Sequence, residues 1–389
     1  MPIIDIIDKK IVIASDSFKG SLSSAEVAEA VAMGIKDVYS DRCNIVKVEI
    51  ADGGEGTLRA LIPSSKARLV NKLVKDPLGR YVNATYGIMQ DGTAIIETAE
   101  ASGLTLLKDS EKNPLITSTY GTGELILDAA CKGCRKFIIG LGGSGTNDGG
   151  TGMLEALGVR FIGGDGKIIT GCCGETLHRI TDLDSSGIPK EIQESTFIVA
   201  CDVETKFCGP EGATYTFAAQ KGADIVQSDY LEKGMNSFNK CILRKTGIDL
   251  NQIPGSGAAG GLGGAFHAFL KAELKKGADI ILEAIQFENI IKDADLIITG
   301  EGKIDNQTRK GKAPYTVLSK GAAIGIPVIA IAGIVEISEK TAEELGFDAV
   351  LPIQPKILDS TGLNEAMDSE NTIRNIRTTV RNYLNSTRK

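Results

Sequence analysis

The chain has 389 residues, of which 42% are hydrophobic and 24% charged, a composition that indicates a globular protein of two or three domains. A net charge of −7 and the absence of Trp argue against nucleic acid or an anionic membrane surface as a partner. No apolar run reaches the roughly 20 residues of a membrane span, the N-terminus is not a secretory signal, and the 8 cysteines are too sparse for a disulfide scaffold, so we expect a cytoplasmic protein.

One unit recurs along the chain: an apolar strand, a loop rich in glycine and acidic residues, and an amphipathic helix. The first predicted strand, residues 11–14, leads into the loop 15–20 and then into a helix that begins with a capping box of Ser23 and Glu26. Further strands of this kind are predicted at residues 45–50, 137–141, 197–200, 296–299 and 328–331. Strands that alternate with helices indicate an α/β protein with a parallel sheet, in which ligands bind beyond the carboxyl ends of the strands.

Other stretches depart from this pattern. Residues 81–89 and 93–97 flank an Asp-Gly turn and are predicted to form a β-hairpin, which fits a second domain better than a doubly wound sheet. Residues 229–277 are mostly helical in pattern, and residues 370–384 form a charged amphipathic helix. We therefore expect a second domain beside the one that carries the parallel sheet.

The most distinctive segment is the glycine loop, residues 140–150, which reads GLGGSGTNDGG. It follows a short apolar run of strand type and precedes a helix-prone segment. Bare backbone N–H groups at the start of a helix form a nest that binds anions, phosphate above all. Because Asp148 would repel phosphate unless a metal ion lay between them, the loop predicts a nucleotide–metal site.

The glycine loop fits the common nucleotide and hydrolase motifs poorly. A Walker loop, the protein-kinase motifs and a GxSxG elbow are absent from the sequence. Residues 140–145 can be matched to a dinucleotide fingerprint with Asp165, but Asp148 lies where the pyrophosphate would come. A second match, which begins at Gly255, follows no strand and is interpreted as a helix start with close packing. An NAD-dependent 2-hydroxy-acid dehydrogenase and a non-catalytic sugar-acid sensor stay open as alternatives.

Acidic side chains follow several of the predicted strands. Taken singly, each is a common turn former or helix cap. Taken together they offer Mg²⁺ ligands and a general base, which phosphoryl transfer requires, and lysine and arginine side chains in the same loops could hold phosphates or a carboxylate. The acids are Asp16, Asp52, Asp148, Asp202, Glu301 and Asp305, and the cations are Lys19, Lys303, Arg309 and Lys312.

Eight segments, taken in order, resemble the bacterial glycerate kinase family of the glyoxylate and glucarate pathways. They are residues 13–22, 52–57, 121–126, 141–150, 220–223, 257–263, 300–308 and 311–314. The resemblance implies ATP-dependent phosphorylation of D-glycerate, on the 2-hydroxyl, with Mg²⁺. It also implies two α/β domains: a flavodoxin-like parallel-sheet domain formed by residues 1–70 and 291–389, and an inserted mixed α/β domain, residues 71–290, that carries the glycine loop.

On the basis of this resemblance we expect the following site. Whether the glycine loop holds ATP or the glycerate stays open. The catalytic residues are Asp16, the first choice to orient or deprotonate the glycerate hydroxyl, Asp52, the second choice, and Lys19 and Asp202. Substrate is bound by Ser17, Arg309, Glu301 and Asp305, with Lys19 also on the glycerate carboxylate. The ATP phosphates are held by Gly142, Gly143, Ser144, Gly145 and Asn147 with Lys221 or Lys312, and Mg²⁺ by Asp148 and Asp202. The protein is expected to be a monomer or a homodimer.

Overall fold

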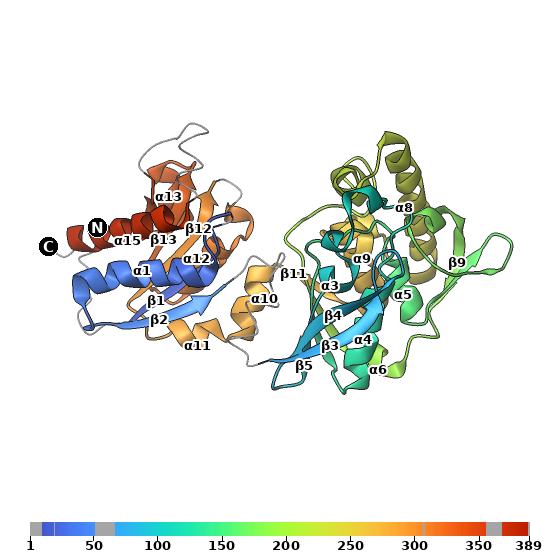
Figure 1. Ribbon diagram of the computed structural model, residues 1–389, viewed down its shortest axis with the longest axis horizontal. Coiled ribbons are helices and arrows are strands. Elements are labelled where there is room, and N and C mark those ends of the chain that lie inside the picture. Colours follow the sequence, from blue (N-terminus) through green and yellow to red (C-terminus); the bar gives the residue numbers. More distant parts are fainter. Residues whose placement is uncertain (1–9, 19, 51–66, 306–307, 355–367, 388–389) are drawn as a thin grey trace. The chain divides into compact units, whose positions relative to one another are not determined.

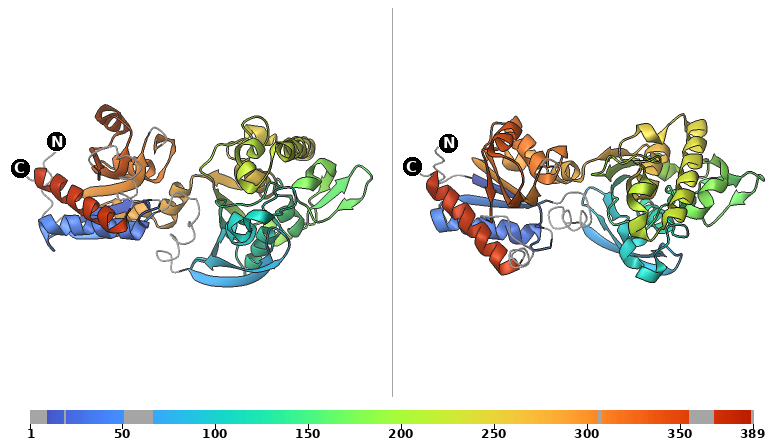
Figure 2. Two further views of the ribbon diagram at one scale, coloured as in Figure 1. Left: turned by 45° about the horizontal axis from the view of Figure 1, so that its top comes forward. Right: turned by 90° about the horizontal axis from the view of Figure 1, so that it is seen from above.

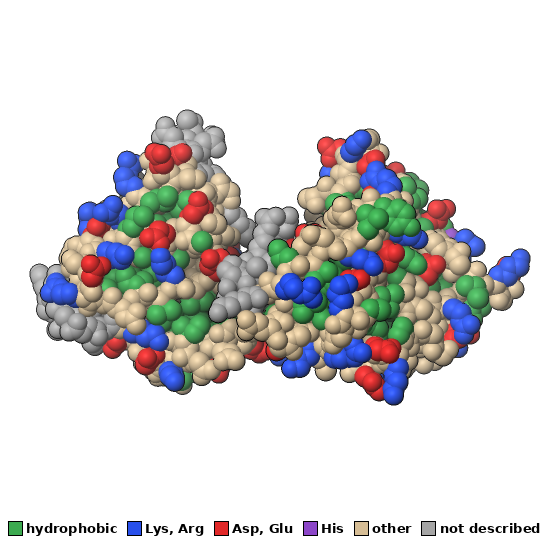
Figure 3. Space-filling model, turned by 60° about the horizontal axis from the view of Figure 1, so that its bottom comes forward, with side chains coloured by type: hydrophobic (Ala, Val, Ile, Leu, Met, Phe, Trp, Pro, Cys, Tyr) green, Lys and Arg blue, Asp and Glu red, His purple; other side chains and the backbone are tan. Residues whose placement is uncertain are grey.

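The computed structural model describes residues 10–18, 20–50, 67–305, 308–354 and 368–387. Contacts divide the chain into two compact units, Met1–Asp52 with Ala278–Lys389 (unit 1) and Gly53–Gly277 (unit 2) (Figure 1). The predicted domain boundaries after residues 70 and 290 stay a prediction. Within the described ranges, no helix is long and apolar enough to cross a membrane. Figure 3 shows Lys and Arg side chains interspersed with Asp and Glu side chains over one face of the protein.

Unit 1 contains a parallel sheet built from both ends of the chain. Its strands are β1 (Lys10–Ser15), β2 (Asn44–Glu49), β12 (Leu296–Ile304), β13 (Val328–Val335) and β14 (Ala349–Pro352). They lie in the order β14-β13-β12-β1-β2, and every neighbouring pair is parallel. Numbered within the unit, this order is 2-1-3-4-5, which is the flavodoxin-like arrangement. The predicted fold class, a flavodoxin-like sheet with a second mixed α/β part inserted, is confirmed.

Unit 1 also contains six described α-helices. They are α1 (Ser24–Tyr39), α10 (Gly277–Ala284), α11 (Phe287–Ile291), α12 (Ala313–Ala323), α13 (Glu339–Leu345) and α15 (Ser369–Ser386). Of these, α1, α12 and α13 pack on the strands of its sheet, and α15 packs on α1. The predicted capping box of Ser23 and Glu26 begins α1. The predicted C-terminal helix is α15, which packs beside α1 and pairs Arg377 with Asp37 through two hydrogen bonds of 2.6 and 2.7 Å (Figure 1).

The strand β12 is longer than the sequence pattern predicts. Residues 300–304 were expected in a loop, but Glu301, Lys303 and Ile304 are paired with β13. The prediction of a loop was wrong because glycine and charged residues adopt extended backbone where a neighbouring strand supplies the hydrogen bonds. Because β1 ends at Ser15, opposite Gly300, the last residues of β12 lie beyond the end of β1.

Unit 2 contains a mixed six-stranded sheet. Its strands are β3 (Arg68–Lys75), β4 (Tyr81–Ile88), β5 (Thr93–Glu97), β6 (Lys136–Gly140), β10 (Thr196–Ala200) and β11 (Glu273–Lys275), in the order β11-β10-β6-β5-β4-β3. Neighbouring strands from β11 to β5 pair in parallel. The strand β4 pairs antiparallel with both β5 and β3. The predicted hairpin of β4 and β5 is confirmed. The edge strand β3 gave no clear sequence signal because five of its eight residues are exposed, so the apolar alternation is weak.

The remaining elements of unit 2 pack around this sheet. Its helices are α3 (Ala99–Ser102), α4 (Tyr120–Cys131), α5 (Thr151–Ala156), α6 (Lys190–Gln193), α7 (Ala213–Phe217), α8 (Ile225–Thr246) and α9 (Ala258–Leu270). A small antiparallel sheet, β7 (Arg160–Gly163) with β8 (Ile168–Ile169) and β9 (Ile180–Asp184), packs against α8 (Figure 2). In the core, Phe137 and Phe197 of adjacent strands stack with ring centroids 4.6 Å apart.

Candidate active site

The glycine loop of unit 2 leaves β6 and leads into α5, and some of its N–H groups are used within the protein. Gly145 N–H donates to Ser102 O at 2.8 Å, and Gly149 N–H donates to Gly260 O at 2.9 Å. The N–H groups of Gly142, Gly143 and several buried residues of the loop donate to no acceptor in the described part of the chain, and of these only Gly142 and Gly143 are not buried. Gly143 is exposed and has φ +72°, a left-handed conformation that suits glycine. Because Ser144–Asp148 are buried, the part of the loop able to receive an anion is centred on Gly142 and Gly143.

Lys221 lies beside the glycine loop, although it is far away in the sequence. Its side chain is buried, and Nζ donates to Thr146 O at 2.6 Å and to Ser144 Oγ at 3.1 Å. Burial lowers the pKa of Lys221 to about 8, and the nearby carboxylate of Asp148 opposes this effect. Lys221 therefore supplies a largely protonated cation to the loop at neutral pH.

Asp148 is fully buried, and four donors bind its carboxylate. Oδ2 accepts from Thr119 N and Thr119 Oγ1, both at 2.8 Å, and from Gly152 N at 3.1 Å, while Oδ1 accepts from Gly150 N at 3.0 Å. Burial raises the pKa of Asp148, whereas these donors act in the opposite direction. The assignment of Asp148 as a metal ligand stays a prediction, and its contacts favour a role in ordering the loop.

Thr119 is a residue of this site that the sequence did not reveal. Its Oγ1 donates to Asp148 and accepts from Met153 N at 2.9 Å, so one hydroxyl joins the start of α4 to the loop and to α5. The available signal was its position just before the family-like segment 121–126.

Asn147 and the glycines of α9 form the inner side of the loop. Asn147 is fully buried, and its Nδ2 donates to Thr214 Oγ1 at 3.3 Å. Gly260 has φ +68°, and a Cβ there would lie 2.2 Å from Thr146 O. The segment around Gly260 therefore packs directly on the loop, as the close-packing interpretation of this glycine motif expected.

Asp202, predicted as a catalytic residue and metal ligand, follows β10, the strand next to β6. Its side chain is exposed, and Oδ1 accepts from Gly277 N at 3.0 Å. Because β6 and β10 are parallel, Asp202 and the glycine loop begin at the same edge of the sheet.

In unit 1, Asp16 lies at the carboxyl end of β1. Its side chain is buried, Oδ1 accepts from Ser17 N at 2.6 Å, and its backbone N–H donates to Gly300 O at 2.9 Å. Two other predicted residues of this region, Lys19 and Asp52, lie outside the described residues.

The end of β12 carries a second cluster, which unites several predicted residues. Glu301 is buried, its Oε1 accepts from Thr308 Oγ1 at 2.6 Å, and its Oε2 lies 3.2 Å from Lys312 Nζ. Lys312 also lies 3.7 Å from Asp305, while Arg309 is exposed. Burial raises the pKa of Glu301. Thr308, which the sequence reasoning missed, lies within the family-like segment 300–308.

The two lysines predicted as alternatives for the phosphates therefore have different surroundings. Lys221 contacts the glycine loop of unit 2, and Lys312 contacts acidic side chains of unit 1. Lys303 pairs with Glu336 at 2.9 Å. Among the residues that the structure describes, no three His, Cys, Asp or Glu side chains are grouped as a metal site.

Comparisons with known proteins give one consistent result. The model of the glycerate kinase family matches residues 11–387. The chain is 45% identical over 347 residues to a glycerate kinase of Bacillus subtilis (strain 168), with 89% of this chain and 90% of the relative covered. It is 42% identical over 349 residues to a glycerate 2-kinase of Escherichia coli (strain K12), covering 90% and 91%. A crystal structure assigned as glycerate kinase 2 from Salmonella typhimurium LT2 is similar with a TM-score of 0.83 and 40% identity, covering 97% and 98%.

Proposed function

Because the chain belongs to the glycerate kinase family, we propose that it transfers the γ-phosphoryl group of ATP to the 2-hydroxyl of D-glycerate. Family membership makes the protein a kinase, so the dehydrogenase and sensor alternatives are set aside. The name of the Escherichia coli relative, glycerate 2-kinase, supports the choice of hydroxyl.

The observation that carries the assignment of the nucleotide is the pairing of open backbone donors with a buried cation. Gly142 and Gly143 offer N–H groups, and Lys221 lies against the same loop through Ser144 and Thr146. Phosphate groups bind to such backbone nests, and a lysine that neutralises their charge strengthens the site. We therefore assign the ATP phosphates to the glycine loop and Lys221.

The acceptor side is assigned to unit 1. Asp16 is held at the end of β1 by Ser17 N–H and is the carboxylate that we propose orients or deprotonates the glycerate hydroxyl. Arg309 is exposed and could pair with the glycerate carboxylate. The Glu301–Thr308–Lys312 cluster would fix the neighbouring strand end.

Mg²⁺ is implied by the chemistry, and the residues present fit it in part. The Asp148 carboxylate is saturated by four protein donors, whereas Asp202 is exposed at the same sheet edge as the loop. Mg²⁺ usually keeps several waters and takes one or two carboxylates together with substrate phosphates, so Asp202 suffices as a protein ligand. When bound, the ion would neutralise charge on the β- and γ-phosphates.

The test is ADP release from ATP in the presence of D-glycerate, L-glycerate and related hydroxy acids, followed by phosphorus NMR of the product. We expect turnover with D-glycerate and a 2-phosphoglycerate product. Formation of 3-phosphoglycerate would overturn the regiochemistry, and no ADP release with any acceptor would overturn the assignment of ATP.

The glycine loop can be tested separately. Gly143→Ala adds a Cβ 3.2 Å from Ala99 Cβ at a left-handed φ, and we expect the KM for ATP to rise about tenfold with the KM for glycerate unchanged. Gly92→Ala is the matched control, because Gly92 also has positive φ but open space around it. Equal effects of the two variants on the KM for ATP would contradict the assignment.

A further inference from the structure

A segment distant from the glycine loop in sequence lies along it. This wrapping segment, residues 102–119, begins with two backbone hydrogen bonds to the loop. Leu104 N–H donates to Gly143 O at 2.8 Å, and Gly145 N–H donates to Ser102 O at 2.8 Å. The position of Gly143 therefore depends on where the wrapping segment is held.

The far end of the wrapping segment contacts the loop again. Thr117 Oγ1 donates to Gly145 O at 3.0 Å, and Thr119 binds the carboxylate of Asp148. Between them, Ser118 N–H donates at 2.9 Å to Pro77 O, in the turn that joins β3 to β4. This turn therefore anchors the far end of the wrapping segment.

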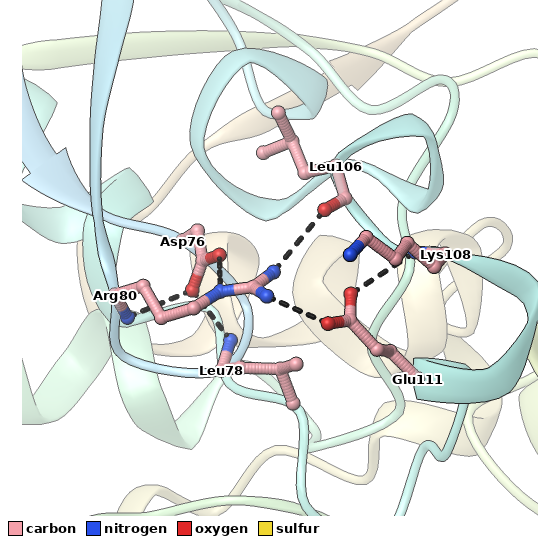
Figure 4. Close-up of polar contacts among 6 residues, drawn as sticks. All are labelled: Asp76, Leu78, Arg80, Leu106, Lys108 and Glu111. Atoms are coloured by element: carbon pink, nitrogen blue, oxygen red, sulfur yellow. Dashed lines mark hydrogen bonds and ion pairs between the residues drawn. The ribbon is translucent and has the colours of Figure 1, made fainter.

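The same turn holds the middle of the wrapping segment through Arg80 (Figure 4). Arg80 Nη1 donates to Glu111 Oε1 at 2.8 Å, and Nη2 donates to Leu106 O at 3.3 Å. The second oxygen of Glu111 accepts from Lys108 N at 3.1 Å. One guanidinium thus fixes two points of a segment that has little regular secondary structure.

The turn is rigid enough to act as an anchor because Asp76 organises it. Asp76 is buried, and its carboxylate accepts from Leu78 N at 2.8 Å, from Arg80 N at 2.9 Å and from Arg80 Nε at 2.6 Å (Figure 4). The planar guanidinium is held on one side by Asp76 and binds the wrapping segment with its other two nitrogens.

We propose that Arg80 is a positioning residue for the glycine loop, which sets the backbone of Gly143 by clamping the wrapping segment at Leu106 and Glu111. The proposal rests on the proposed function, in which this loop holds the phosphates of ATP. Arg80 is about half exposed, so its ion pairs contribute little to overall stability. Its loss should therefore change nucleotide binding much more than folding.

The experiment compares Arg80→Ala, Arg80→Lys and Glu111→Ala with Arg160→Ala as the matched control. Arg160 is an arginine of similar exposure in the same unit, and it pairs with Asp184 in the small sheet. For each protein we would measure kcat, the KM for ATP, the KM for D-glycerate and the melting temperature.

We expect Arg80→Ala and Glu111→Ala each to raise the KM for ATP about fivefold or more, within the roughly 10²-fold that a 1 Å displacement can cost. A double variant that combines Arg80→Ala with Glu111→Ala should have a KM for ATP no higher than that of Arg80→Ala, because the two side chains act through one ion pair. Arg80→Lys should have a KM for ATP between those of the wild type and Arg80→Ala, and the KM for D-glycerate should not change in any variant. An unchanged KM for ATP in Arg80→Ala, or an equal rise in Arg160→Ala, would overturn the proposal.

The Gly143→Ala variant separates this failure from that of the proposed function. If Gly143→Ala raises the KM for ATP while Arg80→Ala does not, the loop holds ATP but Arg80 does not position it. If neither variant changes the KM for ATP, the glycine loop is not the phosphate site.

Discussion

Replacing Lys221 with methionine tests whether the lysine is a buried cation, because methionine has a similar length and no charge. Burial lowers the pKa of Lys221 from 10.5 to about 8. At about 1.4 kcal/mol per unit of pKa, the charged form is therefore about 3 kcal/mol less favourable in the folded protein than in the unfolded chain. This cost is fully present below pH 8, where the lysine is charged in both states.

Between pH 8 and pH 10.5 the folded lysine is largely neutral while the unfolded one stays protonated. The unfolded state then binds more protons, so the free energy of unfolding of the wild type rises with pH relative to Lys221→Met. From pH 7 to pH 9 we expect the free energy of unfolding of the wild type minus that of Lys221→Met to increase by about 1 kcal/mol.

The assay is urea unfolding at several pH values, followed by circular dichroism because the chain contains no Trp. Lys167→Met is the control, since it removes a lysine whose side chain is 84% exposed rather than buried. A flat or falling difference for Lys221→Met would refute the argument that burial lowers this pKa.

Three further predictions concern other contacts. Thr119→Val removes a hydroxyl that donates to the Asp148 carboxylate and should lower the free energy of unfolding by about 2 kcal/mol. Thr119→Ser keeps a hydroxyl and should retain most of that stability. Equal losses of stability in urea unfolding of the two variants would contradict the role of this hydrogen bond. Gly260→Ala places a Cβ 2.2 Å from Thr146 O at positive φ and should lower the free energy of unfolding by about 3 kcal/mol or more. A melting temperature equal to that of the wild type would contradict the close packing of Gly260 on the glycine loop. Asp16→Asn should lower kcat with D-glycerate by about 10²-fold without changing the KM for ATP. A kcat near that of the wild type in the ADP-release assay would show that Asp16 does not act in catalysis.

The sequence by itself determined the elements whose signals are local. Alternating apolar strands and amphipathic helices fixed the α/β class, the Asp-Gly turn marked the hairpin of β4 and β5, and Ser23 with Glu26 marked the start of α1. These signals are readable because side-chain periodicity, turn residues and helix caps act over a few neighbouring residues. The order of the family-like segments likewise identified the kinase family.

Tertiary structure alone decided how the residues of the site are used. Asp148 looked like a metal ligand in the sequence, but Thr119, 29 residues away, helps to saturate its carboxylate. Lys221 and Lys312 were equivalent as cations until the fold placed Lys221 against the glycine loop and Lys312 beside Glu301. Buried polar groups must find their partners wherever the chain brings a donor or acceptor, and these partners are distant in sequence. The sequence therefore shows which residue types are available, and packing decides which of their donors and acceptors remain for a ligand.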